Sequence, residues 1–269
     1  MDSYRGQNLN REVVGLIPAA GQATRIGPLP CSKELYPVGF ETEHHGQEAI
    51  RPKVVCQYLL EKMRLAGIKK AFIVLRDGKW DIPSYLGDGS SLDMHLGYLM
   101  MGLPFGVPYT LDQAYPFVQD AIVALGYPDT IFGPDDAFVQ LLEQQAASDD
   151  DLVLGIFPAD RPQKVDMVDI GDDGQIRQIV IKPRKTHLRY KWAIAVWTPV
   201  FTHFMHEYLA NIERPEGTRS EVRIGRIIQA AIDSNLRVRG VHVSDDPLLD
   251  IGTADDLLRA VRRFISDKE

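Results

Sequence analysis

A short apolar run near the amino end leads into a turn of small residues: Val13-Val14-Gly15-Leu16-Ile17-Pro18-Ala19-Ala20-Gly21-Gln22-Ala23-Thr24-Arg25. The run 13–17 is rich in branched residues and ends at a proline and a glycine, which is typical of a buried strand. The small residues let backbone N–H groups approach phosphate oxygens, and Arg25 adds a permanent positive charge. We therefore predict a strand that ends in an anion-binding turn; a plain tight turn is the alternative.

The segments that follow predict an open α/β sheet. Residues 53–66 carry apolar side chains at helical spacing, and residues 71–75 form a second apolar run. The order strand, helix, strand favours a parallel sheet, and such sheets bind ligands where their strands end. Lys33, eight positions after Arg25, is a second cation that could reach the same anion.

The rest of the chain predicts a mixed sheet. Residues 83–112, rich in Gly and Pro, are expected to be a loop around one or two short elements. Patterns beyond them predict helices over 114–125, 136–147, 199–211 and 219–233 and after Gly252-Thr253, strands over 152–157, 192–197 and 236–243, and a hairpin of 166–170 with 176–181 around Asp172-Asp173-Gly174. We predict a three-layer, Rossmann-like α/β fold with a small antiparallel insertion, in one domain (12–269) after a polar segment (1–11).

Composition limits the class of protein. The 269 residues are 45% hydrophobic and 25% charged, which excludes a disordered or fibrous chain. Thirty basic and 37 acidic residues give a net charge of −7, the opposite of what a nucleic-acid-binding protein usually carries. The sequence has no apolar stretch of the length that a membrane span needs, and its polar first residues do not resemble a signal peptide. Its only cysteines, Cys31 and Cys56, are too few for a disulfide framework. We expect a cytoplasmic protein that does not bind membranes.

The order of several motifs resembles the sugar-1-phosphate nucleotidyltransferases. The resemblance covers residues 12–265, and it is closest to glucose-1-phosphate thymidylyltransferase and to the UTP–glucose-1-phosphate uridylyltransferases. It implies the fold of the nucleotide-diphospho-sugar transferases. The motifs that carry it are the turn ending in Thr24-Arg25, Ser32-Lys33-Glu34-Leu35-Tyr36-Pro37-Val38, Arg51-Pro52-Lys53, Leu86-Gly87-Asp88-Gly89-Ser90, Tyr127-Pro128-Asp129-Thr130-Ile131-Phe132 and Leu249-Asp250-Ile251-Gly252-Thr253.

This resemblance implies an enzyme that makes an NDP-sugar. A sugar 1-phosphate attacks the α-phosphate of a nucleoside triphosphate in line and releases pyrophosphate, so cations are needed around the phosphates, and no covalent nucleophile is needed. By the family pattern, Arg25 and Lys33 are catalytic, and Asp129 and Asp250 hold Mg²⁺. The pattern further assigns the nucleotide to Ala19, Ala20, Gly21, Thr24 and Gln113, and the sugar phosphate to Lys182 and Glu221.

Without the resemblance, plainer interpretations of the same residues stay open. Asp129 fits a turn and Asp250 fits a cap near a helix. Lys182, at the end of a predicted strand, fits a solvated lysine. Gln113 and Glu221 fit polar residues near helix N-termini, where a glutamate is favourable by itself.

The chain departs from the family pattern mainly on the sugar side. Alanine stands at 20 and 23 where the family usually has glycine, and Ile181 replaces the glutamate of the family's Glu-Lys-Pro. We expect dTTP or UTP and a hexose 1-phosphate as substrates, with the sugar altered or its binding weakened sooner than the reaction changed. Members of the family are commonly homo-oligomers, and we expect the same here. The alternatives are a catalytically degenerate regulatory protein that binds a nucleotide or sugar nucleotide, and a CTP-dependent transferase with another acceptor.

Overall fold

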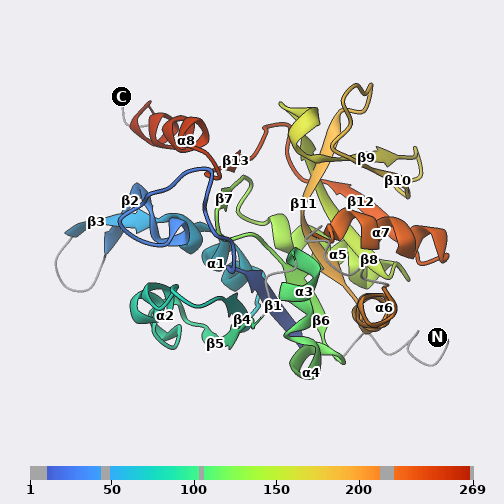
Figure 1. Ribbon diagram of the computed structural model, residues 1–269, viewed down its shortest axis with the longest axis horizontal. Helices are drawn as coiled ribbons and strands as arrows, with labels where there is room; N and C mark the ends of the chain where they lie inside the picture. Colours follow the sequence, from blue (N-terminus) through green and yellow to red (C-terminus); the bar gives the residue numbers. More distant parts are fainter. Residues whose placement is uncertain (1–10, 44–48, 103–105, 213–220, 267–269) are drawn as a thin grey trace.

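A nine-stranded sheet with helices on both faces organises the computed structural model, which describes residues 11–43, 49–102, 106–212 and 221–266 (Figure 1). Its amino-terminal half consists of parallel neighbours. In spatial order these strands are β6 (Ile122–Leu125), β1 (Val13–Pro18), β4 (Lys70–Leu75) and β5 (His95–Met100).

The other half of the sheet is mixed. Strand β11 (Tyr190–Trp197) runs antiparallel to β6 and to β8 (Leu152–Pro158), and β12 (Val238–His242) runs parallel to β8. The hairpin of β9 (Asp166–Ile170) and β10 (Ile176–Ile181) extends this half, because β9 pairs with the start of β11.

Two hydrophobic cores hold the helices against the sheet. One contains apolar residues of α3 (Val107–Asp112), α6 (Pro199–Asn211) and α7 (Ile224–Asp233), and the other those of α1 (Val55–Leu65) and α5 (Ala137–Ala147). Helix α7 illustrates the packing: Ile227 and Ile228 are both almost fully buried, each worth about 1.5–3 kcal/mol. None of the helices in the described ranges is long and apolar enough to cross a bilayer.

Smaller elements complete the fold around the sheet. They are η3 (Lys33–Leu35), the pair β2 (Pro37–Glu43) and β3 (Ala49–Val54), α2 (Asp81–Leu86), η4 (Ser90–Leu92), α4 (Tyr115–Val118), the pair β7 (Thr130–Ile131) and β13 (Leu249–Asp250), η5 (Pro162–Lys164) and α8 (Ala254–Ser266). A third core joins β2, β7 and α8 through Val38, Ile131 and Ala260. This core packs α8, the last helix of the chain, against β2 (Figure 1).

The predicted α/β fold and the 166–181 hairpin are confirmed, but the helix over 114–125 is wrong. Only α4 is helical there, and the next apolar run, 122–125, is strand β6. This strand is buried on both faces between β1 and β11, so its side chains show no alternation to separate a strand from a helix. Residues 83–112, expected to be mostly loop, also contain the sheet strand β5. Nearly all of the predicted polar segment 1–11 lies outside the described residues, and the domain limits stay a prediction.

Candidate active site

The predicted anion-binding loop lies where β1 and β4 end side by side. The backbone N–H of Ala19 donates to the carbonyl of Val74 at 2.9 Å, so the first loop residue is still tied to the sheet. Ala19 and Ala20 are buried, whereas Gly21 and Thr24 are exposed. An anion would therefore meet the loop from Gly21 onward.

Ala23 gives this loop a conformation that alanine rarely adopts. Its φ is +54°, in the left-handed region. Its carbonyl accepts hydrogen bonds from the N–H groups of Ile26 and Gly27 at 3.2 and 3.0 Å, which closes a turn around Thr24 and Arg25. A Cβ atom makes this region unfavourable by about 1–2 kcal/mol. The surrounding structure thus holds Ala23, in the turn that carries Arg25, in a conformation that alanine does not favour.

Lys33 connects the loop to the first of the predicted metal ligands. Its side chain is only 13% exposed, and its ammonium forms an ion pair with Asp129. A Cβ placed on Gly21 would lie 3.9 Å from Lys33 Nζ, so the ammonium lies under the loop. Burial lowers the pKa of Lys33, but the charge and hydrogen bond of Asp129 and the charge of Asp250 help to raise it overall. Lys33 is therefore a protonated cation at neutral pH.

The short β7–β13 ladder brings Asp250 beside Asp129. In this ladder Asp250 pairs with Thr130, the residue after Asp129. Oδ1 of Asp250 accepts the backbone N–H of Gly252 at 2.6 Å. Burial and the charge of Asp129 raise the pKa of Asp250, and together they outweigh the opposite effects of Lys33 and of the Gly252 N–H. Two carboxylates far apart in the sequence thus form one negatively charged site.

Arg25 approaches this site from the loop. A Cβ placed on Gly252 would lie 3.0 Å from Nη2 of Arg25 and 2.7 Å from Oδ1 of Asp250. The Arg25 side chain is exposed and makes no hydrogen bond or ion pair with any residue that the structure describes. Its charge is therefore available to an external anion. The structure brings together the two cations, Arg25 and Lys33, and the two carboxylates at the end of β1.

The paired carboxylates fit a magnesium ion. Mg²⁺ is usually held by one or two carboxylates together with substrate phosphates. Burial, followed by the negative charge of Asp129, raises the pKa of Asp250, and Lys33 compensates these effects only in part. Within the described ranges, no three His, Cys, Asp or Glu side chains gather to enclose a metal. An ion at Asp129 and Asp250 would therefore need phosphate oxygens to complete its ligands.

A second group of charges lies around the end of β10. Lys182 follows this strand with a φ of +41°. Burial raises the pKa of Asp166, and the charges of Arg223 and Lys182 oppose that effect. Burial also raises the pKa of Tyr127, and the charges of both Asp129 and Asp166 add to the rise. The phenol of Tyr127 therefore lies close enough to sense the carboxylates of both groups.

Among the described residues, Gln113 and Glu221 form no hydrogen bond or ion pair with the charges around Asp129 or around Lys182. Gln113 is exposed at the end of α3 and donates from Nε2 to the carbonyl of Tyr109 at 3.4 Å. Glu221 is exposed, precedes α7 instead of starting it, and has its Cβ 3.5 Å from where a Cβ on Gly106 would lie. Their binding roles stay predictions.

A buried ion pair next to Lys33 has no signal in the sequence. Glu34 is 1% exposed and accepts two hydrogen bonds from Lys79 Nζ, at 2.6 and 2.7 Å. Burial raises the pKa of Glu34 and lowers that of Lys79, while their attraction opposes both shifts. The partners are 45 positions apart, so no local pattern connects them. The pair ties η3 to the loop that follows β4.

A hollow of about 450 Å³ opens between these two loops. It is lined by Gly21, Ala23 and Lys33 on one side and by Arg76 and Gly78 on the other. Its volume is within the range of pockets for small ligands. Loop backbone and charged side chains of both signs, including Asp77 and Asp81, therefore line one cavity at the end of β1 and β4.

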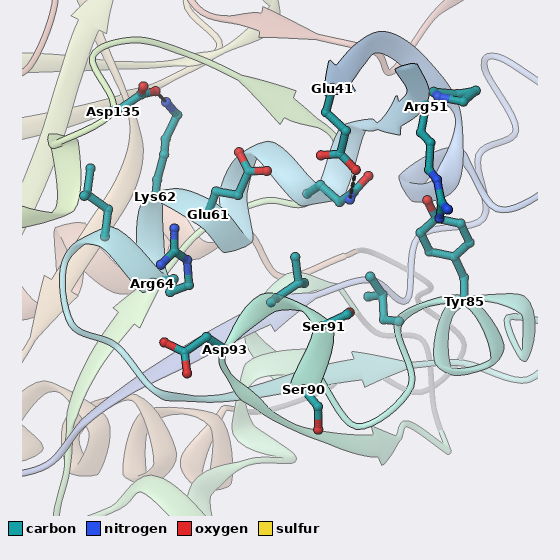
Figure 2. Close-up of a pocket in the computed structure, with 15 residues that line it drawn as sticks. Glu41, Arg51, Glu61, Lys62, Arg64, Tyr85, Ser90, Ser91, Asp93 and Asp135 are labelled. Atoms are coloured by element: carbon teal, nitrogen blue, oxygen red, sulfur yellow. Dashed lines mark hydrogen bonds and ion pairs between the residues drawn. The ribbon is translucent and has the colours of Figure 1, made fainter. Parts of the chain in front are cut away.

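A larger hollow, of about 1010 Å³, lies between α1, the β2–β3 pair and η4 (Figure 2). Polar groups inside it are already paired with each other: Lys62 with Asp135, and Gln57 with Glu41 at 3.3 Å. None of the site residues predicted from the sequence lines this hollow. The smaller hollow, which is lined by Lys33 and by the loop residues Gly21 and Ala23, is the better candidate.

Comparison with known proteins identifies the family of this chain. The family model described as nucleotidyl transferase matches residues 14–267. The chain belongs to the nucleotidyl transferase family. The low-salt glycan biosynthesis nucleotidyltransferase Agl11 of Haloferax volcanii is 25% identical over 94% of this chain and 66% of its own length. The glucose-1-phosphate thymidylyltransferase of Streptomyces griseus is 27% identical, again over 94% of this chain and 66% of that protein.

This nucleotidyl transferase thus spans about two thirds of the length of those curated relatives. A crystal structure from Bacillus anthracis, described as a glucose-1-phosphate thymidylyltransferase in complex with sucrose, superposes with a TM-score of 0.79. The match covers 94% of this chain and 95% of that one at 20% identity, which confirms the fold.

Two departures from the family pattern have a structural counterpart in this nucleotidyl transferase. Ala23, at a usual glycine position, has the left-handed φ that glycine adopts at little cost, whereas Ala20 does not have a positive φ. Ile181, at the family's glutamate position, ends β10 and pairs across the hairpin with Asp166. The first departure affects the loop, and the second affects the charges around Lys182.

Proposed function

We propose that this chain is a sugar-1-phosphate nucleotidyltransferase that uses dTTP or UTP and a hexose 1-phosphate and releases pyrophosphate. The observation that carries the proposal is the convergence of Arg25, Lys33, Asp129 and Asp250 at the end of β1. The thymidylyltransferase relatives support a pyrimidine nucleotide and a glucose-like sugar. Both substrates are polyanions, so the reaction needs clustered cations more than it needs a nucleophile.

Each charged group has a distinct task in this reaction. Arg25 is exposed and unpaired among the described residues, so it would bind the β- and γ-phosphates and stabilise the departing pyrophosphate. Lys33 is held between Gly21 and Asp129, where its fixed ammonium would face the α-phosphate. Lys182 would bind the phosphate of the sugar. Gln113, through its amide, would pair with the pyrimidine edge.

Asp129 and Asp250 would hold Mg²⁺ together with the phosphates. The bound ion supplies charge neutralisation at the reacting phosphate. Because burial and mutual repulsion raise the pKa of Asp250, this pair should bind the ion in exchange for a proton as the pH rises. The resemblance to the family also supports our expectations of a cytoplasmic location and a homo-oligomer, and sedimentation analysis would measure the second.

The test is a panel of nucleoside triphosphates and hexose 1-phosphates scored by pyrophosphate release, with Mg²⁺ and with a chelator. We expect the highest rates with dTTP or UTP. Release with CTP and another acceptor would identify the CTP-dependent alternative. Nucleotide binding by calorimetry without release from any pair would contradict the proposal and favour the regulatory protein.

The variant Lys33→Met tests whether the ammonium of Lys33 contributes to the reaction. Removal of one preorganised cation from the reacting phosphate should reduce turnover about 100- to 1000-fold. The matched control is Lys70→Met, because Lys70 forms an exposed ion pair with Glu12 at the far end of β4. Equal turnover of the two variants would remove Lys33 from the mechanism.

A further inference from the structure

The hairpin β9–β10 places a carboxylate opposite the position where the family's own carboxylate is missing. Ile181 stands where the family has the glutamate of Glu-Lys-Pro, which removes an acceptor for a sugar hydroxyl. In the antiparallel register, Ile181 pairs directly with Asp166. Residues that pair in this way point to the same face of the sheet, with Cβ atoms about 4.5–5.5 Å apart. Asp166 therefore presents its carboxylate to nearly the same space.

The surroundings of Asp166 fit a ligand-binding carboxylate. Oδ1 is buried and makes no hydrogen bond to any of the described residues. Arg223 and Lys182 are close enough for their charges to lower its pKa, although burial raises it overall. A buried acceptor without a donor is unfavourable, and a hydroxyl group of a ligand would satisfy it. The backbone N–H of Lys182 faces the same carboxylate and helps to lower its pKa, so Oδ1 is the oxygen that remains without a donor among the described residues.

Helix α7 packs closely against this carboxylate but leaves room for it. A Cβ placed on Gly225 of α7 would lie 2.5 Å from Oδ2 of Asp166, so the absence of a side chain there leaves room for the carboxylate. Tyr127 is two residues before Asp129 in the chain, and it is close enough to Asp166 for that charge to add to the rise of its pKa. Trp192 lies next to this tyrosine, with ring centroids 6.3 Å apart. Aromatic faces beside a carboxylate are well suited to a sugar ring.

We propose that Asp166 accepts a hydrogen bond from a ring hydroxyl of the sugar 1-phosphate, in place of the glutamate that Ile181 replaces. This inference rests on the proposed function, because it names a specificity-determining residue of the same site. Since the carboxylate comes from β9 instead of β10, it approaches the ring from a different direction. The chain should therefore select its sugar by a different hydroxyl than relatives with Glu-Lys-Pro.

The variant Asp166→Asn tests this assignment by pyrophosphate release. The KM for the sugar 1-phosphate should rise about 10- to 100-fold, because a hydrogen bond to a charged acceptor is lost. The KM for the nucleotide and kcat should change less than threefold. The matched control is Asp169→Asn, an acidic residue on the same strand but on its other face. This control should leave both KM values unchanged.

Deoxy analogues of the sugar 1-phosphate separate binding from a purely structural effect. The wild-type protein should discriminate at least tenfold against the analogue that lacks one particular hydroxyl, and Asp166→Asn should lose that discrimination. The double variant Asp166→Asn with Ile181→Glu returns the carboxylate to the family position. It should recover sugar binding and shift the discrimination to another hydroxyl.

Failure of the inference and failure of the proposed function give different results. Wild-type turnover with an unchanged sugar KM in Asp166→Asn would overturn the role of Asp166 alone. An equal rise of the KM for both substrates would also overturn it, because a general distortion affects both sites. A wild-type protein that releases no pyrophosphate with any pair would overturn the proposed function, and the role of Asp166 with it.

Discussion

Replacement of Ala23 by glycine should stabilise the protein, although glycine usually has the opposite effect. Ala23 has a φ of +54° in the loop that carries Arg25. Glycine at position 23 has no Cβ to clash in the left-handed region, so the substitution should raise the free energy of unfolding by about 1–2 kcal/mol. Glycine also has more conformational freedom than alanine in the unfolded chain, and this lowers the free energy of unfolding by about 0.4–1 kcal/mol. The net gain in the free energy of unfolding should be about 0.5–1 kcal/mol.

Ala20→Gly is the matched control, because it makes the same chemical change three positions earlier in the same loop. Ala20 has no positive φ and is 8% exposed. Glycine there loses backbone entropy, about 0.5–1 kcal/mol, and a buried methyl group, about 0.8 kcal/mol. The two variants should therefore change stability in opposite directions, with Ala20→Gly less stable by about 1.5 kcal/mol.

Urea unfolding followed by circular dichroism measures both effects, provided that the m-values stay constant. For a domain of this size, each 1 kcal/mol shifts the Tm by about 2–3 °C. The temperature midpoint should therefore rise in Ala23→Gly and fall in Ala20→Gly. A loss of stability in both variants would refute the idea that the loop holds Ala23 under strain.

Two further predictions concern the groups around the site. Lys79→Met leaves Glu34 as an unpaired buried carboxylate, and it should destabilise the fold by about 3–5 kcal/mol at pH 8. Because burial raises the pKa of Glu34 above its unfolded value, the native state takes up a proton first, so this loss should shrink toward pH 5 in urea titrations. The double variant with Glu34→Gln should recover most of the stability at pH 8. Gly252→Ala places a methyl group 2.7 Å from Oδ1 of Asp250. The variant should raise the Mg²⁺ concentration needed for half-maximal pyrophosphate release about tenfold. An unchanged Mg²⁺ requirement would show that Asp250 does not bind the metal.

The fold was largely predictable because its strongest patterns are local. The run 13–17, the helix that ends before Gly67 and the turn at Asp172-Asp173-Gly174 each carry their own stop signals. Strand β6 was not predictable in this way, since residues 122–125 are apolar on both faces. Its identity depends on β1 and β11, which lie on either side of it. A local pattern cannot report neighbours of this kind.

The candidate site also contains residues that sequence motifs indicate and residues that no motif indicates. Arg25, Lys33, Asp129 and Asp250 come from motifs whose order resembles a known family, and the structure brings these residues together. Their assigned roles still depend on experiment. The Glu34–Lys79 pair lies beyond any such motif, because a buried ion pair requires only that two distant segments meet.

Asp166 shows why a missing motif residue does not by itself mean a missing function. In the family pattern, Ile181 stands at the position of a glutamate. The antiparallel register makes Asp166 its neighbour on the same face, so a carboxylate is still present beside position 181. In such a hairpin, either strand can place a carboxylate at the same point in space. An altered sugar is then a more economical explanation of Ile181 than a degenerate site, because loss of function alone gives no reason for a buried acceptor to arise across the ladder.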